Sequence, residues 1–159
     1  MSILFRKISQ LFFIATLPFI SSAQNPEGFD KMAKRMADKT VPIIKSSQVV
    51  KLQEKDKKIV FLDARELEEY KVSHIENAIH VGYDNFDMKS VANIDKNIVV
   101  IVYCSVGYRS GKIGKKLRNA GFTSVFNLYG GLFDWANNGN EVFAEGKKVE
   151  KIHPYNNKW

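Results

Sequence analysis

Short apolar runs alternate along the chain with stretches in which apolar residues recur every three or four positions. Unbroken apolar runs are typical of strands buried in a parallel sheet, and they predict strands at residues 43–44, 59–62, 78–81, 98–103 and 125–128. Helical spacing predicts helices at residues 25–39, 48–53, 66–71, within 82–97, between 110 and 121, and at 132–137. This alternation predicts an α/β fold with a mainly parallel central sheet flanked by helices.

Polar residues before two of these helices indicate where the helices begin. Ser46 and Ser47 precede the helix at 48–53, and Asp63 and Arg65 precede the helix at 66–71. Because side chains of this kind satisfy the free N–H groups of a first helical turn, we expect the serines to cap the first of these helices, and Asp63 or Arg65 the second.

The first 23 residues follow the pattern of a secretory signal peptide. Arg6 and Lys7 precede an apolar run at residues 8–20, and Ser21-Ser22-Ala23 supplies the small residues of a cleavage site. The run is shorter than the roughly 20 residues that span a bilayer, which favours cleavage after Ala23 over an uncleaved anchor. We expect an exported protein, periplasmic or secreted, with residues 1–23 as signal peptide, 24–46 as an N-terminal helix or linker, and 47–159 as the domain.

The chain is basic, with a formal net charge of +7. Its lysines are scattered and interleaved with acidic residues, which is typical of a solvated surface. We therefore expect no nucleic-acid partner, no stable membrane insertion after cleavage, and at most a modest attraction for small anions. The chain has one cysteine, Cys104, so it cannot form an internal disulfide.

Cys104 lies between the strongest strand pattern and a helical pattern. A lone cysteine is often a small buried hydrophobe without chemistry. Here, however, Gly107 makes a turn that runs into a helix N-terminus, where backbone N–H groups and the positive end of the helix dipole stabilise a thiolate. This position favours Cys104 as a nucleophile.

Four blocks of residues resemble a single-domain rhodanese over about Val49 to Val142. They are Phe61-Leu62-Asp63-Ala64-Arg65-Glu66 with Glu69-Tyr70, His74-Ile75-Glu76-Asn77-Ala78-Ile79, Cys104 to Ser110, and Gly121-Phe122 through Gly130-Gly131 to Trp135. The resemblance implies a rhodanese-like fold and a sulfurtransferase. Cys104 would accept sulfane sulfur from a donor such as thiosulfate, form a persulfide, and pass the sulfur to cyanide, a small thiol or a protein thiol.

The resemblance also implies roles for the residues around Cys104. The substrate-binding residues would be Ser105, Val106, Gly107, Tyr108, Arg109 and Ser110. Arg109 would bind the anionic donor or the departing sulfite, while Asp63 and Arg65 would support the structure, as would His74. The covalent sulfur on Cys104 would be the only cofactor. No metal site is expected, because His80 and His153 have no ligand spacing with each other or with Cys104.

The length and composition of the loop narrow the chemistry. Four residues separate Cys104 from Arg109, whereas the related phosphatases and arsenate reductases have five, in a wider cradle for a tetrahedral oxyanion. The tighter loop favours the transfer of sulfur over the binding of phosphate. Ser105 stands where some thiosulfate-using members of the family carry a charged residue, so the identity of the sulfur donor stays open. The loop also lacks the Gly-Ser-Gly-Val-Thr run of members that use mercaptopyruvate, which disfavours that substrate. Ser73 and Asn77 stand at positions, on either side of His74-Ile75, where members of the family commonly have glycine.

Two other kinds of function remain open from the sequence. Cys104 could hold sulfur or sense oxidants for a partner without fast turnover, as a sulfur carrier or redox-sensing binding module. The chain could also be a phosphatase or arsenate reductase, which the loop length disfavours.

Overall fold

The computed structural model describes residues 26–36 and 38–152. The predicted signal peptide and His153 lie outside these residues. Among the residues that are described, no helix is long and apolar enough to cross a membrane.

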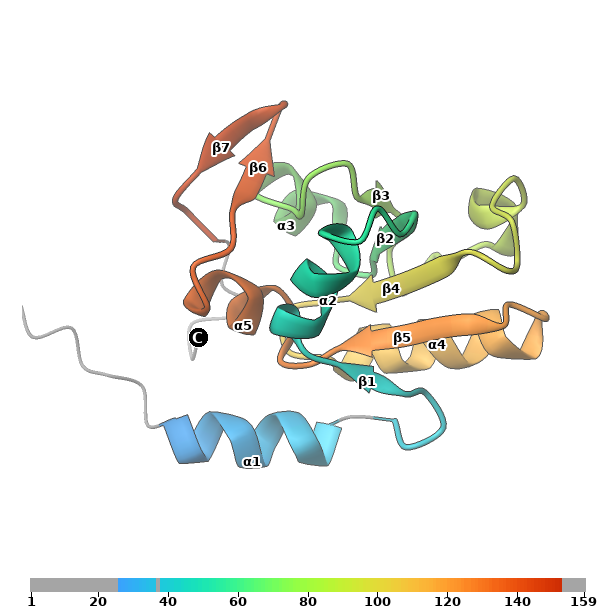
Figure 1. The fold of residues 1–159 in the computed structure, drawn as a ribbon, viewed down its shortest axis with the longest axis horizontal. Helices are drawn as coiled ribbons and strands as arrows, with labels where there is room; N and C mark the ends of the chain where they lie inside the picture. The colour runs from blue at the N-terminus through green and yellow to red at the C-terminus, as the bar shows by residue number, and fades with distance from the viewer. Residues whose placement is uncertain (1–25, 37, 153–159) are drawn as a thin grey trace, which may run out of the picture.

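The centre of the fold is a five-stranded parallel sheet with strand order β1-β5-β4-β2-β3 (Figure 1). Its strands are β1 (Ile43–Ile44), β2 (Ile59–Asp63), β3 (Ile79–His80), β4 (Val99–Tyr103) and β5 (Ser124–Leu128). β4 pairs with β2 on one side and with β5 on the other, in parallel register. The predicted α/β class and mainly parallel sheet are confirmed, and each predicted strand is present, although β3 is shorter than expected.

Helices cover both faces of the sheet (Figure 1). They are α1 (Pro26–Met36), α2 (Ser46–Gln53), α3 (Leu67–Val72), α4 (Tyr108–Asn119), α5 (Gly131–Asn137) and the 3-10 helix η1 (Met88–Val91). On one face Ile113 and Leu117 of α4 pack with Val102, and on the other Leu132 and Trp135 of α5 pack with Ile101 and Tyr103. This two-sided burial explains why the strands are apolar without alternation.

The helix starts differ from the sequence expectation. α2 begins at Ser46, and the backbone N–H of Lys45 before it donates to Gln48 Oε1 at 2.9 Å. In the same way the N–H of Glu66, which precedes α3, donates to Glu69 Oε2 at 3.0 Å. The predictions of serine caps for α2 and of Asp63 or Arg65 for α3 were wrong. In both helices a Gln or Glu at the third helical position reaches back to the preceding backbone N–H.

A C-terminal hairpin was not predicted. It comprises β6 (Val142–Ala144) and β7 (Lys147–Val149), joined by Glu145 and Gly146, which both have positive φ. Such a two-residue turn matches the twist of paired strands. Two backbone hydrogen bonds of 2.8 Å, between His74 and Phe143 in each direction, hold the hairpin against the end of α3.

Candidate functional site

Cys104 is the first residue after β4, at the carboxyl end of the central strand. A short loop follows, and α4 begins at Tyr108 directly after Gly107, whose φ of +107° favours glycine. The start of α5 closes the other side, since the Leu132 N–H donates to the Cys104 carbonyl at 2.8 Å. A Cβ at Gly131 would overlap that carbonyl oxygen. Glycine at 131 therefore allows α5 to approach the cysteine loop.

Hydrogen-bond donors lie around the sulfur of Cys104. The backbone N–H of Gly107 donates to Sγ at 3.1 Å, and the Ser110 hydroxyl lies 3.5 Å from it. The sulfur also faces the N-terminal turn of α4, where the helix dipole is positive. Cys104 is only 1% exposed. These groups are arranged to stabilise negative charge on a buried sulfur, as a nucleophilic cysteine requires.

Arg109 points away from solvent into a cluster with Glu69 and Ser105. Its Nη1 donates to Glu69 Oε2 at 2.6 Å and its Nη2 to Glu69 Oε1 at 2.9 Å, a bidentate ion pair. The Ser105 hydroxyl donates to Glu69 Oε1 at 2.9 Å and accepts from Arg109 Nη2 at 3.0 Å. All three residues are buried. The cluster ties the cysteine loop to α3.

Burial opposes the charges of both Glu69 and Arg109, but their contacts outweigh it. Hydrogen bonds from Arg109 and from the Glu66 backbone hold the pKa of the Glu69 carboxyl below its usual value. The hydrogen bonds and charge of Glu69 raise the pKa of Arg109 above its usual value, with a further contribution from Cys104. Both groups therefore stay ionised at neutral pH, and the positive charge of Arg109 is balanced within the protein.

Asp63 and Arg65 form a second buried pair at the end of β2. Both side chains are fully buried, and Arg65 donates to Asp63 through Nε and Nη2 as well as through its backbone N–H. Arg65 Nη2 also donates to the Ser73 carbonyl at the end of α3. The pair thus joins β2 to the far end of α3.

Asn127 is part of the site, although no sequence pattern predicted it. This β5 residue is 2% exposed, donates through Nδ2 to the Gly107 carbonyl at 2.8 Å, and accepts at Oδ1 from the Ser110 hydroxyl at 2.7 Å. Glu69 was named only as part of a block that resembles the family, and no role was predicted for it. The one sequence feature that could have drawn attention to it is its position three residues after Glu66, the spacing of a helix-capping glutamate.

The outer part of the loop is more exposed. Tyr108 is 47% exposed, and Lys112 Nζ lies 5.7 Å from the centroid of its ring. Beside α4 a groove of ≈ 550 Å³ is lined by Lys112, Lys115, Lys116, Asn119, Tyr83 and Asp84. Basic side chains therefore gather along the helix whose first turn faces Cys104.

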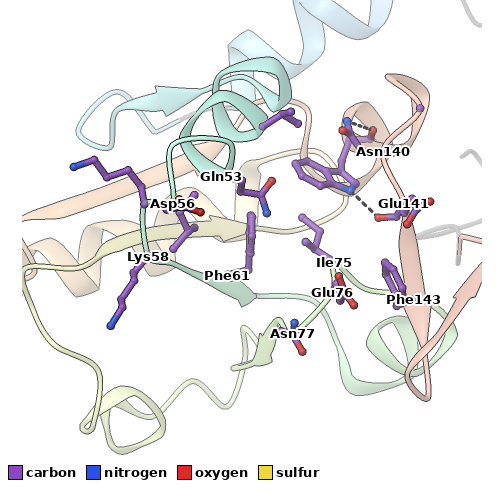
Figure 2. A pocket seen from close by; sticks show the side chains of 15 residues that line it. Gln53, Asp56, Lys58, Phe61, Ile75, Glu76, Asn77, Asn140, Glu141 and Phe143 are labelled. Carbon is purple, nitrogen blue, oxygen red and sulfur yellow. Dashed lines mark hydrogen bonds between the residues drawn. The ribbon is translucent and has the colours of Figure 1, made fainter.

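A further pocket lies away from the cysteine. It has a volume of ≈ 580 Å³, and Figure 2 shows Phe61, Ile75 and Phe143 among its lining side chains, with Lys58 near its edge. Ile59, another lining residue, pairs with Val99 at the start of the parallel strands, whereas Cys104 follows their ends. This pocket therefore reaches toward the starts of the strands, and Cys104 is not among its lining residues. Within the described ranges, no three His, Cys, Asp or Glu side chains are grouped to hold a metal ion.

The comparison with protein families decides the classification. The model of the rhodanese-like domain matches residues 46–138, more than half of the chain. The chain belongs to the rhodanese-like domain family. The resemblance drawn from the four sequence blocks is thereby confirmed.

Named relatives and solved structures are also similar to this chain. A tRNA uridine(34) hydroxylase of Photorhabdus laumondii is 36% identical over 110 residues, which cover 65% of this chain and 30% of the relative. The crystal structure of a thiosulfate sulfurtransferase from Pseudomonas aeruginosa is 25% identical with a TM-score of 0.61, covering 76% of this chain and 23% of that one. A Bacillus halodurans protein shares the fold at 24% identity and a TM-score of 0.63, covering 83% of this chain and 94% of its own.

The rhodanese-like chain thus spans about a third or less of two of these relatives, so their names describe larger proteins. The structure brings the predicted loop residues Cys104, Ser105, Gly107, Arg109 and Ser110 into one cluster. Their individual roles in binding or catalysis remain predictions.

Proposed function

We propose that this rhodanese-like protein is a sulfurtransferase that carries sulfane sulfur as a persulfide on Cys104. The observation that carries the proposal is the convergence of the Gly107 N–H and the Ser110 hydroxyl on a buried sulfur at the start of α4. The four-residue spacing to Arg109 supports sulfur rather than a tetrahedral phosphate as the transferred group.

The reaction has two steps when thiosulfate is the donor. The Cys104 thiolate attacks the outer sulfur of thiosulfate, the bond between the two sulfur atoms breaks, and sulfite leaves with the electron pair. A thiol or cyanide then attacks the terminal sulfur of the persulfide, and the Cys104 thiolate is restored. The donors around Sγ stabilise negative charge before the first step and after the second. The covalent sulfur is the only cofactor in this scheme.

The turnover of thiosulfate with cyanide tests this function. The protein lacking residues 1–23 should form thiocyanate, and Cys104→Ser should form none while keeping the same thermal unfolding. Wild-type protein that loads sulfur but turns over slowly, and gains rate only when a partner is added, would instead be the sulfur carrier. Equal rates for wild type and Cys104→Ser would remove Cys104 from the reaction.

A phosphatase or arsenate reductase remains the alternative chemistry on this fold. Hydrolysis of aryl phosphates by the wild type that disappears in Cys104→Ser would support it. We expect no such activity, because the loop has one residue fewer than the phosphatase pattern.

The names of the relatives favour a second candidate, an action on tRNA. The matched Photorhabdus protein is a tRNA uridine(34) hydroxylase, although the match covers only 30% of it. A tRNA gel-shift titration separates the candidates. Our proposal expects only weak binding that disappears at physiological salt, because its charge attraction would be unspecific. Salt-resistant binding of tRNA would overturn the expectation of no nucleic-acid partner.

We also propose that the protein is exported. The support is the charge and apolar pattern of residues 1–23. Expression of the full chain in a bacterium, followed by cell fractionation and N-terminal sequencing, should give a periplasmic or secreted protein that begins at Gln24. A cytoplasmic protein that still begins at Met1 would contradict export.

A further inference from the structure

Asn127 places a buried amide beside the cysteine loop. It is on β5, between β1 and β4, and is 2% exposed. A buried amide is costly unless its polar atoms are hydrogen-bonded, and backbone pairing of the sheet does not require a polar side chain at this position. The Asn127 side chain bonds to Gly107 and Ser110, which follow the next strand, β4.

The Gly107 carbonyl fixes which way this amide faces. Because a carbonyl can only accept, the nitrogen of Asn127 must face Gly107, at 2.8 Å, and its oxygen must face the Ser110 hydroxyl, at 2.7 Å. Glycine at 111 leaves room for the amide, since a Cβ there would lie 3.3 Å from Nδ2, which is closer than side chains normally pack. The loop and the first turn of α4 are thus built around Asn127.

Both residues also adjoin Cys104 Sγ: the Gly107 N–H donates to it at 3.1 Å, and the Ser110 hydroxyl lies 3.5 Å from it. The Ser110 hydroxyl has a single hydrogen, which Asn127 Oδ1 accepts at 2.7 Å while Sγ lies 3.5 Å away. When the thiol loses its proton to water, the sulfur becomes the stronger acceptor, and a small rotation turns the hydroxyl toward it. Asn127 therefore holds Ser110 within reach of the sulfur and holds Gly107 in its left-handed conformation.

We propose that Asn127 is a positioning residue that prepares both hydrogen-bond donors for the negative sulfur of Cys104. This inference rests on the proposed role of Cys104 as the nucleophile. It predicts that loss of the amide slows the reaction of the thiol itself, in addition to any loss of stability.

The rate at which iodoacetamide alkylates Cys104 tests the inference without any sulfur donor. Asn127→Leu, which has a similar size and no polar atoms, should react about fivefold more slowly at pH 7, and its pH profile should move to higher pH. Asn127→Asp keeps an acceptor for Ser110 but cannot donate to Gly107, and adds negative charge near the sulfur. It should also react more slowly, and it replaces Asn127→Leu if that variant does not fold.

Val125→Ala is the matched control. Val125 lies on the same strand and is 1% exposed, but it packs in the core beside α4. Its replacement should lower the unfolding temperature and leave the alkylation profile unchanged. If Val125→Ala shifted the profile as much as Asn127→Leu does, the effect would be general destabilisation and the inference would be overturned.

Ser110→Ala shows whether Asn127 acts through the hydroxyl. In a Ser110→Ala background, Asn127→Leu should slow alkylation by a smaller factor than in the wild type, because only the Gly107 contact remains to be lost. The same factor in both backgrounds, or wild-type rates in both Asn127 variants, would overturn the inference. The formation of a persulfide on Cys104 is measured in a separate experiment. A wild-type protein that forms no persulfide would refute the proposed function, whereas the alkylation rates would still decide the role of Asn127.

Discussion

At the scale of single residues, the site is a set of polar side chains that burial makes interdependent. Arg109 is fixed by Glu69 and Ser105 rather than extended toward solvent. Removing one partner of such a pair leaves the other charged and buried, which is costly. The first two predictions concern this pair.

Glu69→Gln should lower the free energy of unfolding by about 3 kcal/mol at pH 7, because Arg109 stays buried and loses its nearest counter-charge, while the next carboxylate, of Glu66, is 4.0 Å away and half exposed. The pKa of Glu69 is lowered on folding, so its contribution is complete above its ordinary value of 4.5 and is lost as the pH falls through the lower folded value. Urea unfolding should therefore show a smaller deficit at pH 3 than at pH 7. Glu68→Gln on the same helix is the control, since its contact with Lys71 is exposed. A deficit independent of pH would contradict this account.

Arg109→Ala should reduce kcat/KM for thiosulfate by about a hundredfold, through lost charge near the sulfur and a loosened loop. Arg109→Lys should recover only part of this loss, because a lysine cannot make the two parallel hydrogen bonds to Glu69. Steady-state kinetics of both variants measure the effect. Intact thiosulfate use in Arg109→Ala would show that Arg109 does not bind the donor.

At the scale of elements, the site depends on how closely α5 approaches the loop after β4. Gly131 and Gly139 both have positive φ, but a Cβ at Gly131 would overlap the Cys104 carbonyl, whereas a Cβ at Gly139 would meet nothing within 4 Å. Replacing Gly139 by alanine therefore measures the free-energy cost of the positive φ alone. The same replacement at Gly131 adds the cost of the steric overlap with the Cys104 loop.

Gly139→Ala should cost about 1 kcal/mol of unfolding free energy, the price of a left-handed alanine alone. Gly131→Ala should cost about 3 kcal/mol or more and lower sulfurtransferase activity, because α5 must move away from the Cys104 loop. Urea unfolding and thiocyanate formation measure both effects. Equal losses in the two variants would show that the approach of α5 is unimportant.

The elements were largely predictable from the sequence, and the contacts between them were not. The unbroken apolar run of β4 and the helical pattern after it placed Cys104 correctly, because both signals are local. Glu69 and Arg109 are separated by 40 positions, and Asn127 and Gly107 by 20, so only the folded topology brings them together. The strands of the hairpin, β6 and β7, have three residues each, too few for a clear pattern.

At the scale of the whole molecule, basic side chains line a groove along α4, the helix that follows the cysteine loop, while the arginine of that loop is already paired. The lysines of the groove beside α4 can therefore attract an anionic donor over a distance. Attraction of this kind changes the rate of encounter and is screened by salt.

Replacing Lys112, Lys115 and Lys116 together by Gln should lower kcat/KM for thiosulfate about threefold at low ionic strength, with little effect at high salt. The control replaces Lys55, Lys57 and Lys58, an equal charge near the opposite end of the sheet, where two of these lysines line the other pocket. It should have a smaller effect. Equal salt dependence in both triple variants would mean that net charge alone matters.

The central claim, that Cys104 carries the transferred sulfur, is tested most directly by mass spectrometry. The folded protein is incubated with thiosulfate labelled in its outer sulfur, digested, and analysed before and after cyanide is added. We predict that the Cys104 peptide gains the mass of one labelled sulfur atom, loses it to cyanide, and that Cys104→Ser gains nothing. A folded wild-type protein whose Cys104 peptide gains no sulfur would contradict the account.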